Sequence, residues 1–172
     1  MNFLEAIKSV FSNYAIFSGR ARRSEYWYFT LFNFIVSFIL GYISSIVSLV
    51  WSLVLFIPGL AVGVRRLHDI GKSGKYYLAF MLTYLLFSIL SVVSVINYSE
   101  GLVYVTGALG IIILIMAIVI IIWFCKDSEP GTNQYGPNPK LPDGRVPEDT
   151  YQDNYNPQTG VKTPFGYKAP KA

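Results

Sequence analysis

Three long stretches without a charged residue constrain this chain more than any other feature of its sequence. They cover residues 26–64, 76–99 and 101–125. A helix in a soluble protein needs a polar face toward water, whereas long uncharged helices are stable in lipid. Only 14% of the residues are charged, against about 25% in average soluble domains. The sequence therefore excludes a soluble enzyme and predicts an all-α membrane protein.

The uncharged stretches predict four transmembrane helices. As a single helix, residues 26–64 would be about 58 Å long, whereas the hydrocarbon core of a bilayer is about 30 Å thick. This stretch is therefore expected to form two spans with a turn near residues 43–47. The predicted spans are about residues 26–44, 47–64, 76–96 and 102–124, within a membrane domain that covers residues 1–125.

The basic residues predict the orientation of these spans. Arginine and lysine gather before the first span, between the second and the third, and after the fourth, whereas the two opposite turns contain neither. Because basic loops stay in the cytoplasm, both termini are expected to be cytoplasmic. The basic residues on this side are Arg20, Arg22, Arg23, Arg65, Arg66, Lys72, Lys75 and Lys126.

Outside the spans, the two ends of the chain differ in character. Residues 1–18 place apolar side chains at helical spacing and predict an amphipathic N-terminal helix, which lies either on the bilayer surface or against the protein itself. All prolines except Pro58 follow Lys126, interleaved with glycine, asparagine, aspartate and tyrosine. Residues 126–172 are therefore expected to form a mostly disordered cytoplasmic tail, either inert or used for docking a partner.

The sequence lacks a recognisable set of catalytic or metal-binding residues. Gly71-Lys72-Ser73 resembles the end of a phosphate-binding loop, but Arg66 stands where that motif requires a glycine. His68 is the only histidine, and together with Asp69 it supplies too few ligands for a metal ion. A single cysteine, Cys125, excludes an intramolecular disulfide. We therefore expect no metal and no cofactor, and the net charge of +4 does not predict nucleic-acid binding.

Charged residues near the membrane boundary predict an ion-pair cluster. Glu25 and Asp69 lie close to hydrocarbon and are costly there unless paired, so each is expected to bond an arginine from the other segment. The predicted cluster comprises Arg20, Arg22, Arg23, Glu25, Arg65, Arg66, His68 and Asp69. A second set is expected to contact anionic lipid headgroups or a partner protein. This contact set is Arg65, Arg66, Lys72, Ser73, Gly74 and Lys75.

Two ordered motifs carry a resemblance to a known family. The first is Gly19-Arg20-Ala21-Arg22-Arg23-Ser24-Glu25-Tyr26-Trp27, followed by Arg65-Arg66-Leu67-His68-Asp69 and Ser73-Gly74. The second is Gly131-Thr132-Asn133-Gln134-Tyr135-Gly136-Pro137-Asn138-Pro139. Over residues 1–140 the chain resembles the bacterial membrane family called domain of unknown function 805. The resemblance implies a small multi-pass protein of the bacterial inner membrane and implies no activity.

Three functions of different classes are compatible with the sequence. The first is a non-enzymatic helix bundle whose basic cytoplasmic face binds anionic lipid or a partner protein. The second is a small-solute transporter or channel formed as a homo-oligomer, although the absence of charged residues within the spans counts against ion or proton coupling. The third is an enzyme acting on lipid headgroups, with His68 as base and Asp69 orienting it. Because no nucleophile with helper residues is evident, the sequence favours the first.

Overall fold

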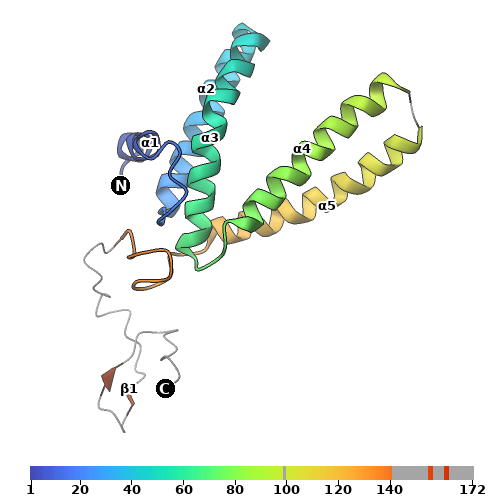
Figure 1. The fold of residues 1–172 in the computed structure, drawn as a ribbon. Helices are drawn as coiled ribbons and strands as arrows, with labels where there is room; N and C mark the ends of the chain where they lie inside the picture. The colour runs from blue at the N-terminus through green and yellow to red at the C-terminus, as the bar shows by residue number, and fades with distance from the viewer. Residues whose placement is uncertain (99, 141–154, 157–160, 163–172) are drawn as a thin grey trace.

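The computed structural model describes residues 1–98, 100–140, 155–156 and 161–162, and it confirms the predicted fold of one short and four long helices (Figure 1). The short helix is α1 (Phe3–Ser12), and the long ones are α2 (Arg23–Ile43), α3 (Ser45–Asp69), α4 (Lys75–Ile96) and α5 (Glu100–Cys125). Two short strands in the tail, β1 (Tyr155–Asn156) and β2 (Val161–Lys162), pair antiparallel. The disorder predicted for residues 141–154, 157–160 and 163–172 concerns residues outside the described part of the chain.

The four long helices are long and apolar enough to cross a membrane. Their outer faces carry large apolar side chains, such as Phe38, Ile46 and Leu114, which are 71%, 72% and 61% exposed. A soluble protein rarely exposes a large contiguous apolar surface, whereas lipid tails are as apolar as these side chains. The exposure agrees with four transmembrane helices surrounded by lipid.

The long helices form two antiparallel hairpins, α2 with α3 and α4 with α5 (Figure 1). The hairpins diverge toward their turns and meet at the opposite end, where Leu67 of α3 packs with Tyr77 of α4 and Phe124 of α5. Gly63 permits this close approach, because a Cβ atom there would collide with the Tyr77 ring. We call this meeting point, which holds the last turn of α3 and the first turns of α2 and α4, the charged end.

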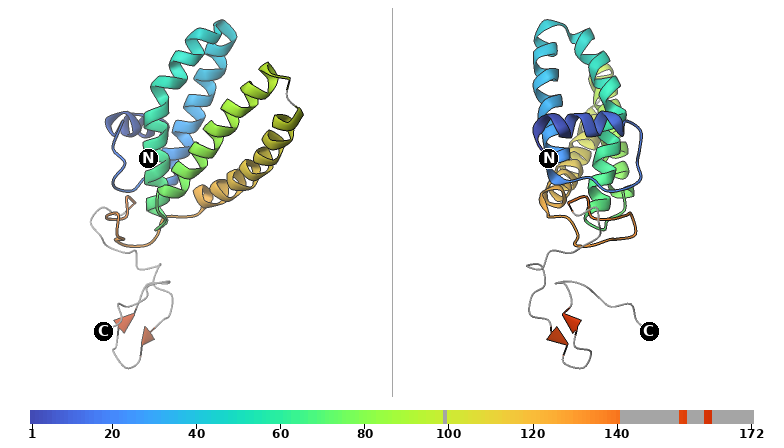
Figure 2. Two further views of the ribbon diagram at one scale, coloured as in Figure 1. Left: turned by 45° about the vertical axis from the view of Figure 1, so that its right-hand side comes forward. Right: turned by 90° about the vertical axis from the view of Figure 1, so that its left-hand side faces the viewer.

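The N-terminal helix α1 packs across α2 and α3 (Figure 2). It begins with a capping box, in which the side chains of Asn2 and Glu5 each accept a hydrogen bond from the backbone amide of the other residue. Ala6 and Val10 are fully buried, and the Phe11 ring lies on α2 near Phe29, with 6.2 Å between ring centroids. Of the two predicted placements, the structure therefore has the helix packed against the protein.

The structure differs from the sequence prediction at the end of the second span. α3 continues through Asp69 instead of ending near Val64, so Arg65 and Arg66 lie on a helix and not in a loop. The helix ends just before Gly71, which has a positive φ of 70°. The difference arises because the loss of hydrophobicity in the sequence marks the membrane boundary, whereas the backbone hydrogen bonds of a helix continue beyond it.

Candidate functional site

The charged end is built where the chain leads into α2 and leaves α3. The backbone amide of Ala21 donates to the carbonyl oxygen of Arg65 at 3.1 Å, which holds residues 19–22, the lead-in to α2, alongside the last turn of α3. Three arginines and two carboxylates from these segments are buried, each with 8% or less of its surface exposed. We call them the buried cluster: Arg20, Glu25, Arg65, Arg66 and Asp69.

Asp69 is the centre of the first half of the buried cluster. Its Oδ1 atom accepts a hydrogen bond from Nε of Arg20 at 3.0 Å, and its Oδ2 atom accepts one from Nη1 of Arg66 at 2.6 Å. The Ser128 hydroxyl also donates to Oδ2, at 2.6 Å. Charge-assisted bonds of this kind are strong, and an unpaired charge in the same place is costly. Asp69 therefore joins three segments that are distant in the sequence.

Glu25 and Arg65 form the second half of the buried cluster. Nη1 of Arg65 donates to Oε1 of Glu25 at 3.1 Å, and both side chains are 5% exposed. The hydroxyl of Ser9 on α1 donates to the same carboxylate oxygen, also at 3.1 Å. Each acidic residue of the cluster is thus bonded to an arginine from the other segment. The second pair in addition fixes α1 to the charged end.

Residues 126–140, which we call the strap, fold back over the charged end. Arg20 donates to the carbonyl oxygens of Glu129 and Gly131 at 2.6 and 2.8 Å. Two further strap carbonyl oxygens accept from arginines, that of Lys126 from Arg66 and that of Pro139 from Arg22. The predicted disordered tail therefore begins with an ordered segment, because buried arginines offer fixed donors to its backbone carbonyls.

The charged side chains of the strap itself stay near the surface. The Asp127 carboxylate lies 3.6 Å from Arg23 and accepts a hydrogen bond from Lys140, and the three side chains are 40–59% exposed. The hydrogen bond from Lys140 lowers the pKa of Asp127. Ion pairs with this exposure contribute little to stability. Arg23, a member of the predicted cluster, therefore lies at its exposed edge.

His68 is bonded away from Asp69. Its Nδ1 atom lies 3.2 Å from the carbonyl oxygen of Gly19, and its ring stacks on Tyr135 with 3.8 Å between centroids and 3° between planes. The bonds that the Asp69 carboxylate makes within the described residues go to two arginines and a serine. The two neighbouring residues therefore lack the geometry of the acid–base pair considered from the sequence.

The two arginines of the predicted contact set lie inside the charged end. Arg65 and Arg66 are only 4% and 0% exposed, so neither lies on the outer surface of the charged end. Burial follows from the continuation of α3, which turns Arg65 toward the first turn of α2 and Arg66 toward the end of α5. Their charge is used inside the protein.

The rest of the predicted contact set lies in the turn between α3 and α4. Nζ of Lys72 lies 4.5 Å from the centroid of the Trp123 ring, whereas Lys75 is exposed at the start of α4. The backbone amides of Lys72 and Lys75 already donate within the turn, the second to the Ser73 hydroxyl at 3.3 Å. Gly74 is buried against Val64, so closely that a Cβ atom on Gly74 would lie 2.5 Å from Cγ1 of Val64. A phosphate contact through these two amides is therefore not available.

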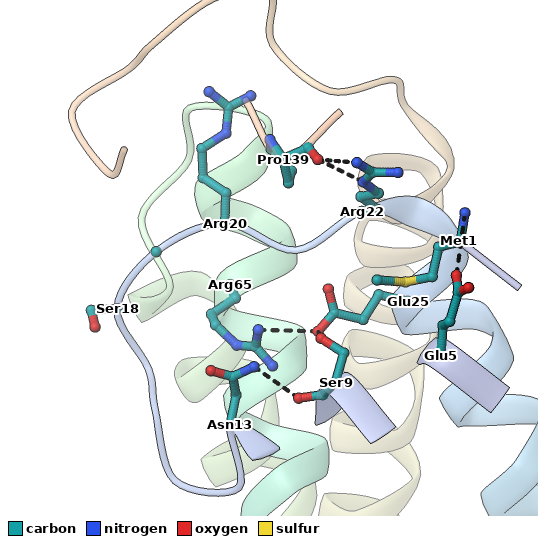
Figure 3. Close-up of a pocket in the computed structure, with 11 residues that line it drawn as sticks. Met1, Glu5, Ser9, Asn13, Ser18, Arg20, Arg22, Glu25, Arg65 and Pro139 are labelled. Atoms are coloured by element: carbon teal, nitrogen blue, oxygen red, sulfur yellow. Dashed lines mark hydrogen bonds and ion pairs between the residues drawn. The ribbon is translucent and has the colours of Figure 1, made fainter. Parts of the chain in front are cut away.

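A pocket of about 480 Å³ lies beside the buried cluster, between α1 and the lead-in to α2 (Figure 3). α1 contributes a polar stripe to it, in which Glu5, Ser9 and Asn13 follow at four-residue spacing. Its other polar lining residues are Ser18, Arg20, Arg22, Glu25 and Arg65. The sequence analysis missed this pocket, and the polar stripe next to the apolar face of α1 is the one signal that pointed to it.

These features define a class of protein. Four long apolar helices, a packed N-terminal helix and a buried charged cluster that closes one end describe a small multi-pass membrane protein. Its polar chemistry is concentrated at the charged end, within the lead-in to α2, the last turn of α3 and the strap.

The chain belongs to the family described as "Protein of unknown function (DUF805)", whose profile matches residues 14–137. It is 34% identical over 140 residues to the inner membrane protein YhaI of Escherichia coli strain K12, covering 77% of this chain and 93% of that protein. It is 31% identical over 143 residues to the inner membrane protein YhaH of the same strain, with the same coverage of 77% and 93%. No solved structure matches the chain. The comparisons confirm the resemblance inferred from the two motifs.

Proposed function

We propose that this protein is non-enzymatic, lies in the bacterial inner membrane with both termini in the cytoplasm, and binds anionic phospholipid headgroups at its charged end. One observation carries the proposal: some basic residues of the charged end are buried, whereas others are exposed. The arginines of the buried cluster hold the bundle together, whereas Lys75 and Lys126 are exposed at the start of α4 and just after α5. Exposed cations at the ends of apolar helices are placed to attract anionic headgroups.

Aromatic side chains at the same level support this placement. Trp27 and Tyr76, at the starts of α2 and α4, are 38% and 54% exposed, and the ammonium group of Lys72 lies over Trp123. Tryptophan and tyrosine favour the headgroup level of a bilayer. The two opposite turns contain no lysine or arginine, so one end of the bundle suits anionic headgroups better than the other. The Escherichia coli relatives are named as inner membrane proteins, which supports the location.

Cysteine labelling is expected to place the charged end inside the cell. Cys125 is exposed at the end of α5, and Glu100 begins the same helix at the opposite end. In intact bacterial cells, a membrane-impermeant maleimide should leave Cys125 unlabelled and should label a Cys125→Ser, Glu100→Cys variant. The pattern should reverse in inside-out vesicles. Labelling of Cys125 in intact cells would overturn the orientation.

Removing the exposed lysines is expected to reduce the preference for anionic lipid about tenfold or more. A basic residue near an anionic surface contributes about 1 kcal/mol, so a Lys75→Gln, Lys126→Gln variant loses about 2 kcal/mol of binding free energy. The measurement is native mass spectrometry of the full chain in nanodiscs that contain equal parts of phosphatidylglycerol and phosphatidylcholine. The ratio of retained phosphatidylglycerol to phosphatidylcholine should fall in the variant.

A charge-matched control keeps this test specific to the charged end. A Lys168→Gln, Lys171→Gln variant removes the same charge from residues outside the described part of the chain and should retain lipid as the wild-type protein does. Equal lipid ratios in all three proteins, or no enrichment of phosphatidylglycerol in the wild type, would contradict lipid binding at the charged end.

A further inference from the structure

An unpartnered edge of a buried guanidinium group lies beside the pocket. Arg65 uses Nη1 to bond Glu25, whereas its Nε and Nη2 atoms are covered and have no hydrogen-bond partner among the described residues. The side chain is 5% exposed and lines the pocket. A buried charged donor without a partner is destabilising, so this edge points to an acceptor that the chain itself does not supply.

The charge balance points to the same conclusion. The three arginines of the buried cluster and Arg22 lie together with two carboxylates, those of Glu25 and Asp69. A third carboxylate, that of Glu5, also lines the pocket, but it lies 4.0 Å from the Met1 amino group, which balances its charge. Arg22 lines the pocket and donates to the carbonyl oxygen of Pro139, with no carboxylate partner among the described residues. Excess positive charge close to hydrocarbon is costly unless an anion offsets it.

The pocket has the size and the lining of a small polar site. Its volume of about 480 Å³ falls within the range of about 300–1,000 Å³ that is typical of ligand pockets. Ser9 of α1 and Asn13, which follows the last residue of α1, add neutral polar groups to its wall. In Figure 3 the guanidinium group of Arg65 extends from α3 toward the space between Glu25, Ser9 and Asn13.

We propose that this pocket binds a phosphate group, with the Nε–Nη2 edge of Arg65 as the principal donor and Arg22 beside it. This edge presents two parallel N–H groups, which match two oxygens of one phosphate. Because this edge is covered in the structure, the guanidinium group has to turn before the edge faces the pocket. Among the described residues, the hydrogen bond to Glu25 is the only one that the guanidinium group makes. The phosphate belongs either to a phospholipid headgroup or to a soluble phosphate ester. The inference rests on the proposed function, because it takes the charged end to lie at the headgroup level.

The test compares two matched arginine-to-lysine variants of the full chain, Arg65→Lys and Arg23→Lys. Lysine keeps the positive charge beside Glu25 but lacks the two-donor edge, and Arg23 is an exposed arginine outside the pocket. One arm counts phosphatidylglycerol molecules retained from nanodiscs by native mass spectrometry. The other measures thermal stabilisation in a zwitterionic detergent by glycerol phosphate against glycerol. We expect one bound molecule per chain in at least one arm, with affinity about tenfold weaker in Arg65→Lys and unchanged in Arg23→Lys.

The outcomes separate this inference from the proposed function. Binding in the lipid arm alone identifies a headgroup, and binding in the soluble arm alone identifies a phosphate ester; both support the pocket. Lipid retention and glycerol phosphate binding that are both equal in Arg65→Lys and wild type, with lipid retention lost in Lys75→Gln, Lys126→Gln, overturn the pocket and leave the proposed function standing. Absence of anionic-lipid preference overturns the proposed function, and absence of binding in both arms overturns the pocket. If Arg65→Lys does not fold, Arg22→Gln replaces it, with the same expected loss.

Discussion

Replacing Asp69 by alanine is expected to lower the free energy of unfolding by about 3–5 kcal/mol. The carboxylate is fully buried and accepts hydrogen bonds from Arg20, Arg66 and Ser128. Its removal leaves two buried guanidinium groups without the carboxylate that both of them share, while their desolvation is unchanged. The measurement is chemical unfolding of the purified protein in a mild detergent, followed by tryptophan fluorescence.

Two further variants show whether burial is the cause of this effect. Asp127→Ala also removes a carboxylate that contacts basic side chains, but that carboxylate is 59% exposed, so its loss should change stability by less than about 1 kcal/mol. Asp69→Asn keeps the shape of the side chain and removes its charge, and it should remain clearly less stable than wild type. Equal stability of the two alanine variants would show that the buried cluster does not hold the charged end together.

Ending the chain after Cys125 is expected to destabilise the membrane domain by several kcal/mol, whereas ending it after Lys140 should leave it folded. The shorter chain loses the strap carbonyl oxygens that accept from Arg20 and Arg66, and the Ser128 hydroxyl that donates to Asp69. Hydrogen bonds to charged groups contribute about 1.5–3 kcal/mol each, and water replaces part of this loss. The longer chain keeps all of these bonds between the strap and the charged end.

Thermal unfolding of the two shortened chains beside the full chain checks this prediction. The full chain and the chain that ends after Lys140 should unfold at similar temperatures, and the chain that ends after Cys125 should unfold at a clearly lower temperature. If the chain that ends after Cys125 were as stable as the full chain, the strap would have no structural role. Loss of stability in the chain that ends after Lys140 would instead assign such a role to residues 141–172.

The four long helices could be predicted because hydrocarbon imposes one simple requirement on a sequence. A stretch such as residues 26–64 has no charged residue, and as one helix it would be longer than the hydrocarbon core is thick. It is therefore expected to cross the membrane twice. The cost of isolated charges near lipid also led to the expectation that Glu25 and Asp69 need arginine partners. These inferences use properties of residue types, which a sequence displays directly.

The strap and the pocket depend on properties that a sequence does not display. The carbonyl oxygens of Glu129 and Gly131 accept from Arg20, and every residue in a chain has such an oxygen, so no residue type marks the contact. The exposure of Arg65 depended on whether α3 ended before it or continued past it, which hydropathy does not report. The pocket depends on how α1 crosses its neighbours, and the spacing of Glu5, Ser9 and Asn13 reveals a polar stripe without saying what it faces.

The position of the strap also sets an order in which the protein can be completed during its synthesis. The strap carbonyls that Arg20 contacts lie 109, 111 and 116 residues later in the chain. When the α2–α3 hairpin has left the ribosome, Arg20 can already bond Asp69, but these carbonyl partners do not yet exist. They arrive only after α5 has been made and inserted. A truncated or stalled chain therefore carries an open charged end, which gives membrane quality-control proteases a physical difference between finished and unfinished copies.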